Sequence, residues 1–493
     1  MSKKIVFIGG GPAGYEGAIR ASQLGADVTI IEKEYIGGVC MNKGCIPTKA
    51  MYKNAEVITH GREGDDYGLE IPSFKVNFKK IMERKDSVVA QLREGTEKLM
   101  TDYNIEVIKG TASFKDEKTL LVEKNEGGTV EVTGDSIIIA TGSKPFIPQV
   151  EGIDNKKVID SDQLLELKEM PKRLVIAGGG VIGLEFAYIF NAFGSEVSII
   201  SNNLVKRMDS KISKRIKPVV KKLGINFVAK SHLKKVEEKD GELIVHTEGK
   251  RGDKKVIGDL LLVSIGRVPL IEGLNLDNIG LEYDKNGISV DDKYQTNLKD
   301  IYAVGDVLGG KMLAHLSAHQ AIEVVEIILG ERDKKTDKPV PDCVFMNPQL
   351  ASAGKTEEQL KEEGVDYIKG EFNFMANGKA VAMNETDGFV KILADKETHK
   401  VLGMHIVGPH ASDIIHEGVV AITEGLKVEK LAEMIHAHPT LAETILEASL
   451  DTLDRAIHLS PKKGMWYTLT NSLYLGRGFL RGSFIILSIN DKH

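Results

Sequence analysis

Two cysteines five positions apart are the residues of this sequence best suited to redox chemistry. Cys40 and Cys45 lie in the segment GGVCMNKGCIPTK. The four residues between them can form one helical turn, which brings the two sulfur atoms within disulfide distance. Lys49 and a helix N-terminus would both favour the thiolate form. The spacing therefore predicts a redox-active pair.

The cysteine pair has two other interpretations, as buried structural residues or as half of a zinc site. Structural zinc needs four ligands, and the sequence has no second short-spaced pair of Cys or His to complete the set. The redox interpretation is preferred, and no metal is expected. Cys343 stands alone in PDCVF and is expected to be a small core residue.

Exchange between thiols and disulfides needs a proton acceptor that works near neutral pH, and imidazole is suited to this task. The segment HAHPTLAE offers His436 and His438, and chemistry alone does not choose between them. The histidines at three other places, His405, His410 and His416, are expected to be ordinary surface or interface residues.

Two similar segments must position this chemistry. Lys4 to Glu32 and Arg173 to Ser201 each contain an apolar strand, a GGG turn, a helix of about a dozen residues and a second apolar strand. Each is a predicted βαβ unit. Their glycines have the spacing GxGxxG, in which the turn is tight and the helix N-terminus faces a pyrophosphate. These glycines are Gly9, Gly11 and Gly14 in the first unit and Gly178, Gly180 and Gly183 in the second.

The residue that ends the second strand distinguishes the two units. Glu32 provides a carboxylate for both hydroxyls of an adenosine ribose, so the first site suits a nucleotide with a free 2′-hydroxyl. The second unit has Ser201 at this place, with Lys206 and Arg207 a few residues on. The usual repulsion of a 2′-phosphate is therefore missing, yet no arginine directly follows the strand. NADH and NADPH are both chemically admissible.

The composition excludes several classes of protein. The 493 residues, 42% hydrophobic and 28% charged, suffice for about three domains of an ordinary globular protein. The net charge of −6 gives no basic field for nucleic acid. Three cysteines cannot build a secreted disulfide framework, and no run of about 18 apolar residues predicts a membrane span. We expect a cytoplasmic protein without a cleaved signal, a membrane contact or a nucleic-acid partner.

Six motifs together resemble the flavin-dependent pyridine nucleotide disulfide oxidoreductases, over residues 3 to about 458. They are GGGPAG at 9–14, GGVCMNKGCIPTK at 37–49, ATGS at 140–143, GGGVIGLEFA at 178–187, YAVGD at 302–306 and HAHPTLAE at 436–443. Within this family the likeness is to the branch that oxidises dihydrolipoyl groups. Residues 46–49 read IPTK, Val181 stands where glutathione-type reductases tend to have a tyrosine, and no Cys-Cys pair lies near the C-terminus.

The resemblance implies an α/β fold with two Rossmann-like dinucleotide-binding domains, for FAD and NAD, and a C-terminal α+β dimerisation domain. The expected parts are 1–148 and 271–343 for the two segments of the FAD-binding and central region, 149–270 for the NAD-binding domain, 344–458 for the interface domain and 459–493 for an atypical tail. The tail contains the only tryptophan, Trp466, and is expected to be a non-catalytic appendage.

The resemblance also implies roles for individual residues. Cys45 would lie against the flavin and form the charge-transfer thiolate, whereas Cys40 would exchange with the substrate. Lys49 would lie near the flavin N5 and pair with Glu185. The implied FAD contacts are Gly9, Gly11, Gly14, Glu32, Lys49, Thr141, Gly142 and Asp306, and the implied NAD contacts are Gly178, Gly180, Gly183, Ser201 and Gly266.

His438 would be the general acid and base of the family, with Glu443 holding its other ring nitrogen and His436 in a supporting role. The family's histidine reaches the active site of the other subunit, which implies a homodimer. The implied reaction passes two electrons from protein-bound dihydrolipoyl groups to NAD. The implied partner is the lipoyl domain of a 2-oxoacid dehydrogenase acyltransferase or a glycine-cleavage carrier protein.

Two alternative functions remain open. An NAD(P)H-dependent reductase of a low-molecular-weight disulfide is suggested by Ser201 and Lys206. A non-enzymatic flavin-bound scaffold or redox sensor, anchored through the tail, is the second.

Overall fold

The first βαβ unit forms the centre of the N-terminal sheet. The structure is a computed structural model that describes residues 2–250 and 252–461. β1 (Lys4–Ile8) and β2 (Asp27–Glu32) pair in parallel and are joined by α1 (Pro12–Gln23), as the sequence predicts. Alternate residues of β1 enter two different hydrophobic clusters, because both faces of the sheet are covered.

The N-terminal sheet has the order β19-β6-β1-β2-β3-β4-β5. Its other strands are β3 (Glu106–Phe114), β4 (Thr119–Lys124), β5 (Thr129–Thr133), β6 (Ser136–Ile139) and β19 (Ile301–Ala303). The chain returns to this sheet at β19 after the second βαβ unit is complete, and α8 (Ala314–Ile328) then packs on α1. Segments from both sides of the second unit therefore build one body.

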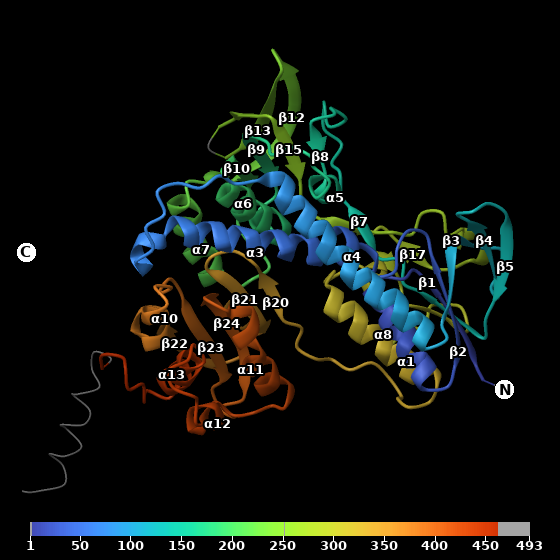
Figure 1. The fold of residues 1–493 in the computed structure, drawn as a ribbon. Helices are drawn as coiled ribbons and strands as arrows, with labels where there is room; N and C mark the ends of the chain where they lie inside the picture. The colour runs from blue at the N-terminus through green and yellow to red at the C-terminus, as the bar shows by residue number, and fades with distance from the viewer. Residues whose placement is uncertain (1, 251, 462–493) are drawn as a thin grey trace, which may run out of the picture.

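The second βαβ unit forms a parallel sheet of its own. β9 (Arg173–Ala177) and β10 (Glu196–Ser201) pair in parallel through α6 (Val181–Phe193), within the order β11-β10-β9-β15-β8. A three-stranded antiparallel sheet of β12, β13 and β14 projects above it (Figure 1). The remaining elements here are β8 (Val158–Ile159), α5 (Ser161–Leu164), α7 (Ser210–Lys222), β11 (Asn226–Ala229), β12 (Ser231–Lys239), β13 (Glu242–Gly249), β14 (Lys254–Gly258) and β15 (Leu260–Val263).

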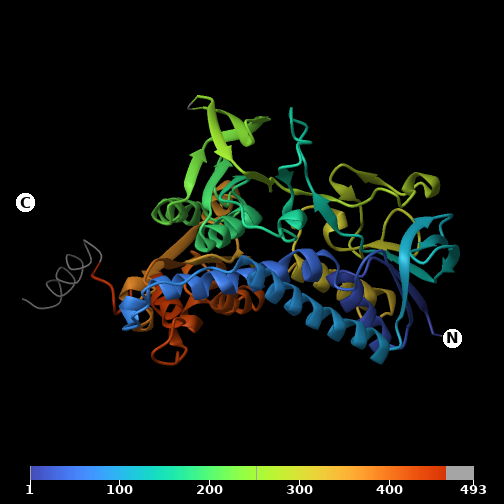
Figure 2. The ribbon, with the colours of Figure 1, turned by 45° about the horizontal axis from the view of Figure 1, so that its top comes forward.

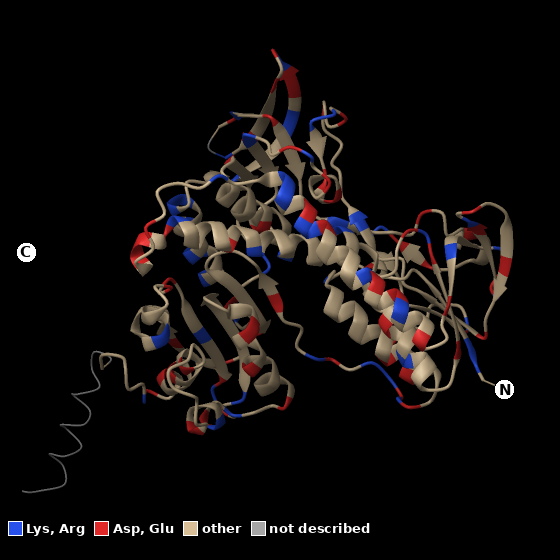
Figure 3. Cartoon of the chain, in the orientation of Figure 1, with Lys and Arg blue, Asp and Glu red and all other residues tan. Residues whose placement is uncertain are grey.

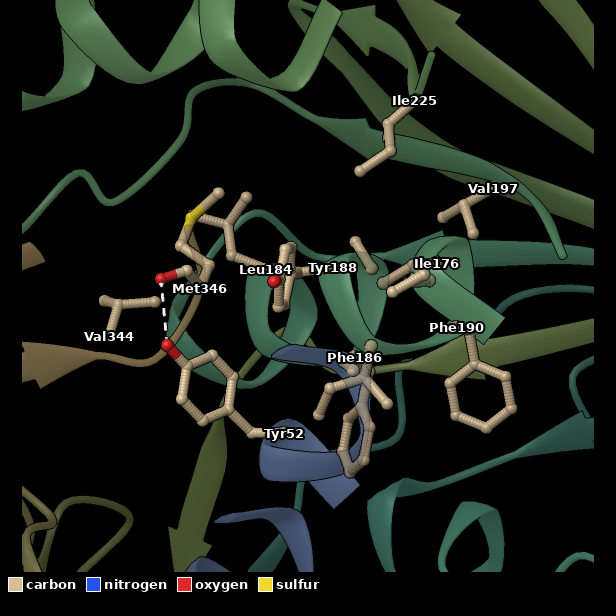
Figure 4. Close-up of a cluster of buried hydrophobic side chains, with 14 of the residues drawn as sticks. Tyr52, Ile176, Leu184, Phe186, Tyr188, Phe190, Val197, Ile225, Val344 and Met346 are labelled. Carbon is tan, nitrogen blue, oxygen red and sulfur yellow. Dashed lines mark hydrogen bonds between the residues drawn. The ribbon is translucent and has the colours of Figure 1, made fainter. Parts of the chain in front are cut away.

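Helix α6 is buried on nearly all sides between its sheet and α3 (Cys45–Arg62). Phe186, Tyr188 and Phe190 of α6 are at most 2% exposed. Figure 4 shows these side chains together with Tyr52 of α3, whose hydroxyl donates a 3.4 Å hydrogen bond to the Met346 carbonyl. This packing joins the cysteine-bearing helix, the second βαβ unit and the C-terminal body.

The C-terminal body is an antiparallel sheet with the order β20-β21-β24-β23-β22, covered by helices. Its elements are β20 (Asp342–Val344), β21 (Gln349–Gly354), α9 (Glu357–Glu362), β22 (Tyr367–Asn373), α10 (Gly378–Ala382), β23 (Phe389–Asp395), β24 (Val401–Gly408), α11 (Ala411–Thr423), α12 (Val428–Glu433) and α13 (Glu443–Thr452). The predicted mixed α/β fold, with an α+β body at its C-terminal end, is confirmed.

The three bodies are linked by α3 and α4 (Phe78–Asp102), which run side by side across the molecule (Figures 1 and 2). Acidic and basic residues are interspersed over all three bodies (Figure 3). In the part of the chain that the structure describes, no helix combines the length and apolarity that a bilayer crossing requires. The predicted appendage lies, from residue 462 on, outside the described residues.

Candidate active site

A cavity of about 1880 Å³ connects the two glycine turns with the cysteine pair. The predicted site residues that line it are Gly9, Gly11, Glu32, Cys40, Cys45, Lys49, Thr141, Gly142, Gly178, Gly180, Glu185, Ser201, Gly266 and Asp306. Gly14, Gly183, His438 and Glu443 do not line it. The fold therefore brings most of the predicted site, from segments far apart in the sequence, to one cavity.

The third glycine of each motif serves the packing of helix against strand. A Cβ atom at Gly14 would lie 1.9 Å from the carbonyl oxygen of Gly9, and one at Gly183 would lie 2.2 Å from that of Gly178. Only glycine permits this approach. The first turns of α1 and α6 consequently reach the cavity, where their free backbone N–H groups can bind a pyrophosphate.

The carboxylate of Glu32 lies at the edge of the first glycine turn. Its Oε2 accepts a 2.7 Å hydrogen bond from the Gly10 N–H, and its Oε1 accepts one of 2.7 Å from the Glu34 N–H. The side chain is 8% exposed and lines the cavity. It occupies the position from which a carboxylate can accept ribose hydroxyls.

The corresponding place in the second unit has no carboxylate. The Ser201 hydroxyl donates a 2.8 Å hydrogen bond to the Asn203 carbonyl. Lys206 and Arg207 are exposed, line the cavity and make no ion pair with any described residue. Asn202 lies 2.7 Å from the His232 Nε2 atom on the same wall. This wall therefore carries polar and positively charged side chains, whereas the wall at the first glycine turn carries the negative charge of Glu32.

The two cysteines meet where one helix ends and the next begins. α2 (Gly38–Lys43) contains Cys40, and Cys45 is the first residue of α3. The predicted helical turn between them is present but stops at Gly44, where a Cβ atom would lie 2.9 Å from the Val39 carbonyl oxygen. The break lets the start of α3 approach α2 closely enough for the thiols to hydrogen-bond.

The environment favours a thiolate at Cys45. The hydrogen bond from the Cys40 thiol and the positive charge of Lys49 lower the pKa of Cys45 to about 7, although burial acts in the opposite direction. The pKa of Cys40 is raised, chiefly because its thiol donates to Cys45 and because it is buried. Cys45 is exposed to the cavity and so can meet a bound group. Because the two thiols titrate together, the pKa for loss of the first proton belongs to the Cys40–Cys45 pair rather than to one cysteine alone.

Lys49 lies one helical turn after Cys45 and forms the predicted pair with Glu185 of α6. Its Nζ atom lies 2.9 Å from both carboxylate oxygens of Glu185, which is 3% exposed. Glu185 also accepts a 3.1 Å hydrogen bond from the Phe345 N–H, and the lysine Nζ lies 4.4 Å from the centre of that ring. The lysine is thus held beside the cysteines by a buried carboxylate and an aromatic face.

Asp306 belongs to a hydrogen-bonded cluster on the cavity wall, whereas the Thr141 hydroxyl donates a 2.6 Å hydrogen bond to the Leu270 carbonyl. The Ser143 hydroxyl donates to Asp306 at 2.6 Å, and the Ser317 hydroxyl does so at 3.3 Å. Arg267 holds Ser143 in turn through its side chain, at 2.8 Å. Sequence reasoning missed these three supporting residues. Ser143 follows the predicted Gly142 and Arg267 follows the predicted Gly266, so adjacency to the motifs was the available signal.

His438 and Glu443 are paired but lie away from the cavity of their own chain. The Nδ1 atom of His438 lies 2.8 Å from Glu443, and the histidine side chain is 78% exposed. Burial would raise the pKa of Glu443, but the Thr440 N–H and His438 together hold it below its usual value. His436 is paired with Glu417 at 3.0 Å and is largely buried. An exposed, oriented imidazole outside its own cavity is suited to act on another molecule.

Two expectations for single residues are wrong. His405 was expected at the surface or an interface, but it is fully buried in β24, because this strand is covered on both faces. Cys343 was expected in the core, but it is only partly buried and lines the cavity. Burial raises its pKa to about 12, so it stays a thiol where Cys45 ionises. His416 is exposed as expected, and it also lines the cavity.

The residues present fit two dinucleotides. Gly142, Gly180 and Gly266 line the cavity, and no atom lies within 4 Å of the place that a Cβ atom would take at any of them. Such open glycines allow the pyrophosphate of a dinucleotide to approach the protein backbone closely. One glycine turn with a carboxylate and one without suit FAD and a nicotinamide nucleotide, respectively.

Two family models match the chain. The model of the pyridine nucleotide-disulphide oxidoreductases matches residues 3–321, and that of their dimerisation domain matches residues 340–449. The match to a dimerisation domain supports a homodimer.

Curated and solved proteins are similar over nearly the whole chain. Dihydrolipoyl dehydrogenase 1, mitochondrial, of Arabidopsis thaliana is 40% identical over 92% of this chain and 91% of its own. The solved flavoprotein disulfide reductase RclA of Escherichia coli, described as HOCl-induced, is 31% identical and superposes with a TM-score of 0.81 over 90% of this chain and 99% of its own. LpdA of Mycobacterium tuberculosis is 26% identical, with a TM-score of 0.85 over 91% and 99%. The chain belongs to the pyridine nucleotide-disulphide oxidoreductase family.

Proposed function

We propose that this protein is a dihydrolipoyl dehydrogenase, which oxidises protein-bound dihydrolipoyl groups and reduces NAD. The observation that carries the proposal is the thiol pair Cys40–Cys45 on the wall of one cavity with both glycine turns. The 40% identity to a plant dihydrolipoyl dehydrogenase over 92% of the chain supports it. FAD, when bound, supplies the two-electron link between the thiol pair and the nicotinamide.

The cysteine pair performs the exchange with the substrate in two steps. A thiolate of the dihydrolipoyl group attacks the Cys40 sulfur of the oxidised pair, which breaks the bond to Cys45 and forms a mixed disulfide. The second lipoyl thiolate then attacks the lipoyl sulfur of that mixed disulfide and releases Cys40. The lipoyl group leaves as a disulfide, two electrons remain on the protein, and they leave again when the cysteine pair re-forms its disulfide and NAD is reduced.

The low pKa of Cys45 makes it the better leaving group of the pair, since a stable thiolate departs more readily. Lys49 provides the positive charge next to this thiolate, and Glu185 holds Lys49 in place and balances its charge. With these assignments, Cys45 and Lys49 are the charge-bearing pair that would face a bound flavin.

His438 accepts the proton of the attacking dithiol, and Glu443 orients its ring. In the homodimer, the histidine of one subunit serves the cavity of the other. The support for this assignment is its exposure and its absence from the cavity wall of its own chain.

The partner and the compartment follow from the same chemistry. The substrate is a lipoyl group carried on a 2-oxoacid dehydrogenase acyltransferase or a glycine-cleavage carrier protein. A cytoplasmic location is proposed as well, because three cysteines in 493 residues cannot build the disulfide framework of a secreted protein.

A second candidate is an NAD(P)H-dependent reductase of a low-molecular-weight disulfide. The wall formed by Ser201, Lys206 and Arg207 favours it, since no carboxylate there repels a 2′-phosphate. The similarity to a flavoprotein disulfide reductase at 31% identity points in the same direction. A non-enzymatic scaffold or redox sensor would depend on the tail. From residue 462 on, the tail lies outside the residues that the structure describes.

The test is the steady-state oxidation of dihydrolipoamide by the FAD-loaded dimer, run in parallel with NAD and with NADP. Fast NAD reduction is expected. An enzyme that turns over neither nucleotide with dihydrolipoamide, but reduces small disulfides with NADPH, would establish the second candidate. A protein lacking residues 462–493 serves as the control, because a catalyst keeps its turnover and an anchored scaffold loses its partner.

A further inference from the structure

The segment between β10 and α7, residues 202–209, forms part of the cavity wall at the second glycine turn. Near its middle, the Val205 N–H donates a 2.8 Å hydrogen bond to the Gly179 carbonyl of that turn. At its end, Asp209 caps α7 by accepting a 3.0 Å hydrogen bond from the Lys211 N–H. The position of Lys206 and Arg207 on the cavity wall therefore depends on how Asp209 is held.

Asp209 is held by the C-terminal body. Its two carboxylate oxygens lie 3.1 and 2.9 Å from the Nζ atom of Lys391 in β23, and one of them accepts a 3.1 Å hydrogen bond from the Glu357 N–H. Asp209 is 0% exposed and Lys391 is 1% exposed. The lysine Nζ also lies 2.5 Å from the Glu357 carboxylate. Two segments 182 positions apart in the sequence are thus joined by a fully buried ion pair.

The ion pair is charged. Burial would raise the pKa of Asp209, but His405, Lys391 and the Glu357 N–H together hold it below its usual value. The Nδ1 atom of His405 lies 2.5 Å from the Ser352 hydroxyl oxygen, and its Nε2 atom donates a 3.0 Å hydrogen bond to the Lys355 carbonyl. A buried pair of this kind adds little net stability over an apolar pair of the same shape, but it fixes one geometry.

The C-terminal body contributes a second wall of the same cavity. Ser352, Thr356 and Gln359 line it, and Ser352 is hydrogen-bonded to the buried His405. Helix α7 contacts this body through Ser210 and Arg215 as well, at 3.3 Å from Glu358 and 2.8 Å from Asp387 (Figure 1). The Asp209–Lys391 pair thus lies behind both walls and touches neither the cysteines nor the cavity.

We propose that Asp209 and Lys391 are positioning residues for the nicotinamide nucleotide. Their ion pair holds segment 202–209 against the C-terminal body and so sets the width of the cavity at the second glycine turn. The affinity for the nucleotide then depends on two residues that do not contact it. This inference rests on the proposed function only in taking the second glycine turn as the nicotinamide nucleotide site.

The experiment measures NAD binding to the oxidised, FAD-loaded dimer by titration calorimetry, for the wild type, Asp209→Asn, Lys391→Met and the double variant. Asparagine caps a helix as well as aspartate, so Asp209→Asn removes the charge and keeps the cap. We expect the Kd for NAD to rise about fivefold or more in each variant. The rate at which dihydrolipoamide reduces the flavin should stay within about twofold, because the cysteines are untouched.

The double variant and a matched control separate positioning from stability. The double variant removes both buried charges, so its melting temperature should recover relative to Lys391→Met while its Kd for NAD stays high. Tyr294→Phe removes a buried 2.8 Å hydrogen bond to Glu323, away from the cavity, and should lower the melting temperature without changing the Kd.

An unchanged Kd in Asp209→Asn, or a Kd that follows the melting temperature in all variants including Tyr294→Phe, overturns the inference. If Lys391→Met does not fold, Asp209→Asn and the double variant still decide the matter. A wild type that binds NAD but does not oxidise dihydrolipoamide would overturn the proposed function and leave this inference intact.

Discussion

The ammonium group of Lys49 lies 2.9 Å from both carboxylate oxygens of Glu185, which is buried in the second turn of α6. The two residues come from different βαβ-associated segments and meet one helical turn from Cys45. The lysine charge lowers the pKa of the Cys45 thiol, whereas the glutamate charge raises it. Opposite effects are therefore expected when either member is neutralised.

Lys49→Met should raise the pKa of the cysteine pair by about one unit, because the thiolate loses its nearest positive charge. Glu185→Gln should lower it, because the lysine charge is then no longer balanced. The rate of alkylation of the reduced enzyme by iodoacetamide, followed against pH, reports the pKa. If the pKa of the cysteine pair shifts in the same direction in both variants, Lys49 and Glu185 act on it through the local fold rather than through their charges.

The wild-type pair should lose its first proton near pH 7, since the pKa of Cys45 is about 7. The sign follows from a lowered acid pKa: the thiolate dominates above pH 7 and is lost as the pH falls below it. The rate of alkylation of the reduced pair should rise about tenfold per pH unit below pH 7 and level off above it. A midpoint near pH 9, the range of an ordinary thiol, would contradict the proposed environment.

His438→Gln should lower the turnover by a factor of roughly 10² to 10⁴, because no side chain then accepts the dithiol proton. Glu443→Gln should lower the turnover less, because the imidazole remains as the proton acceptor and loses only the carboxylate that orients its ring. Wild-type turnover in Glu443→Gln would remove its proposed orienting role.

Mixed dimers test whether His438 serves the other subunit. If each site takes its cysteines from one chain and its histidine from the other, a dimer of one Cys45→Ser chain and one His438→Gln chain contains one intact site and one doubly defective site. Random mixing of equal amounts should restore about a quarter of the wild-type activity, since half of the dimers are mixed and each has one good site. No recovery in verified mixed dimers would place the histidine in the site of its own chain.

Ser201→Glu should make the enzyme more selective for NAD. The new carboxylate would repel a 2′-phosphate, so kcat/KM with NADP should fall about tenfold or more while the value with NAD is kept. Lys206→Ala is the matched variant, which should weaken NADP alone without adding a negative charge. Equal losses for both nucleotides in Ser201→Glu would mean that this wall does not face the 2′-position.

The two βαβ units could be predicted because their information is local. The strand pattern, the GxGxxG spacing and the carboxylate at Glu32 all lie within about 30 residues of chain, and the structure has each element at its predicted place. The pairing of Lys49 with Glu185 came from the family resemblance, since no local pattern relates residues that are 136 positions apart.

The buried network around Asp209 could not be predicted for the same reason. Lys391 and His405 stand in the apolar segments FVKILAD and VLGMHIVG, and a single polar residue in such a strand does not reveal its partner. Both strands lie inside the C-terminal sheet and are buried on both faces, so these side chains needed partners from elsewhere in the chain. An isolated charge in an apolar run was the available signal.

The most direct test of the central claim is NADH formation from dihydrolipoamide and NAD by the wild type, Cys45→Ser and Cys343→Ser. Cys343 is the matched control, because it lines the same cavity but its pKa is raised to about 12. We predict fast turnover by the wild type and Cys343→Ser, and a loss of at least about 10³-fold in Cys45→Ser with the FAD content unchanged. Wild-type turnover in Cys45→Ser, or none in an FAD-loaded wild type whose thiols titrate, would contradict the account.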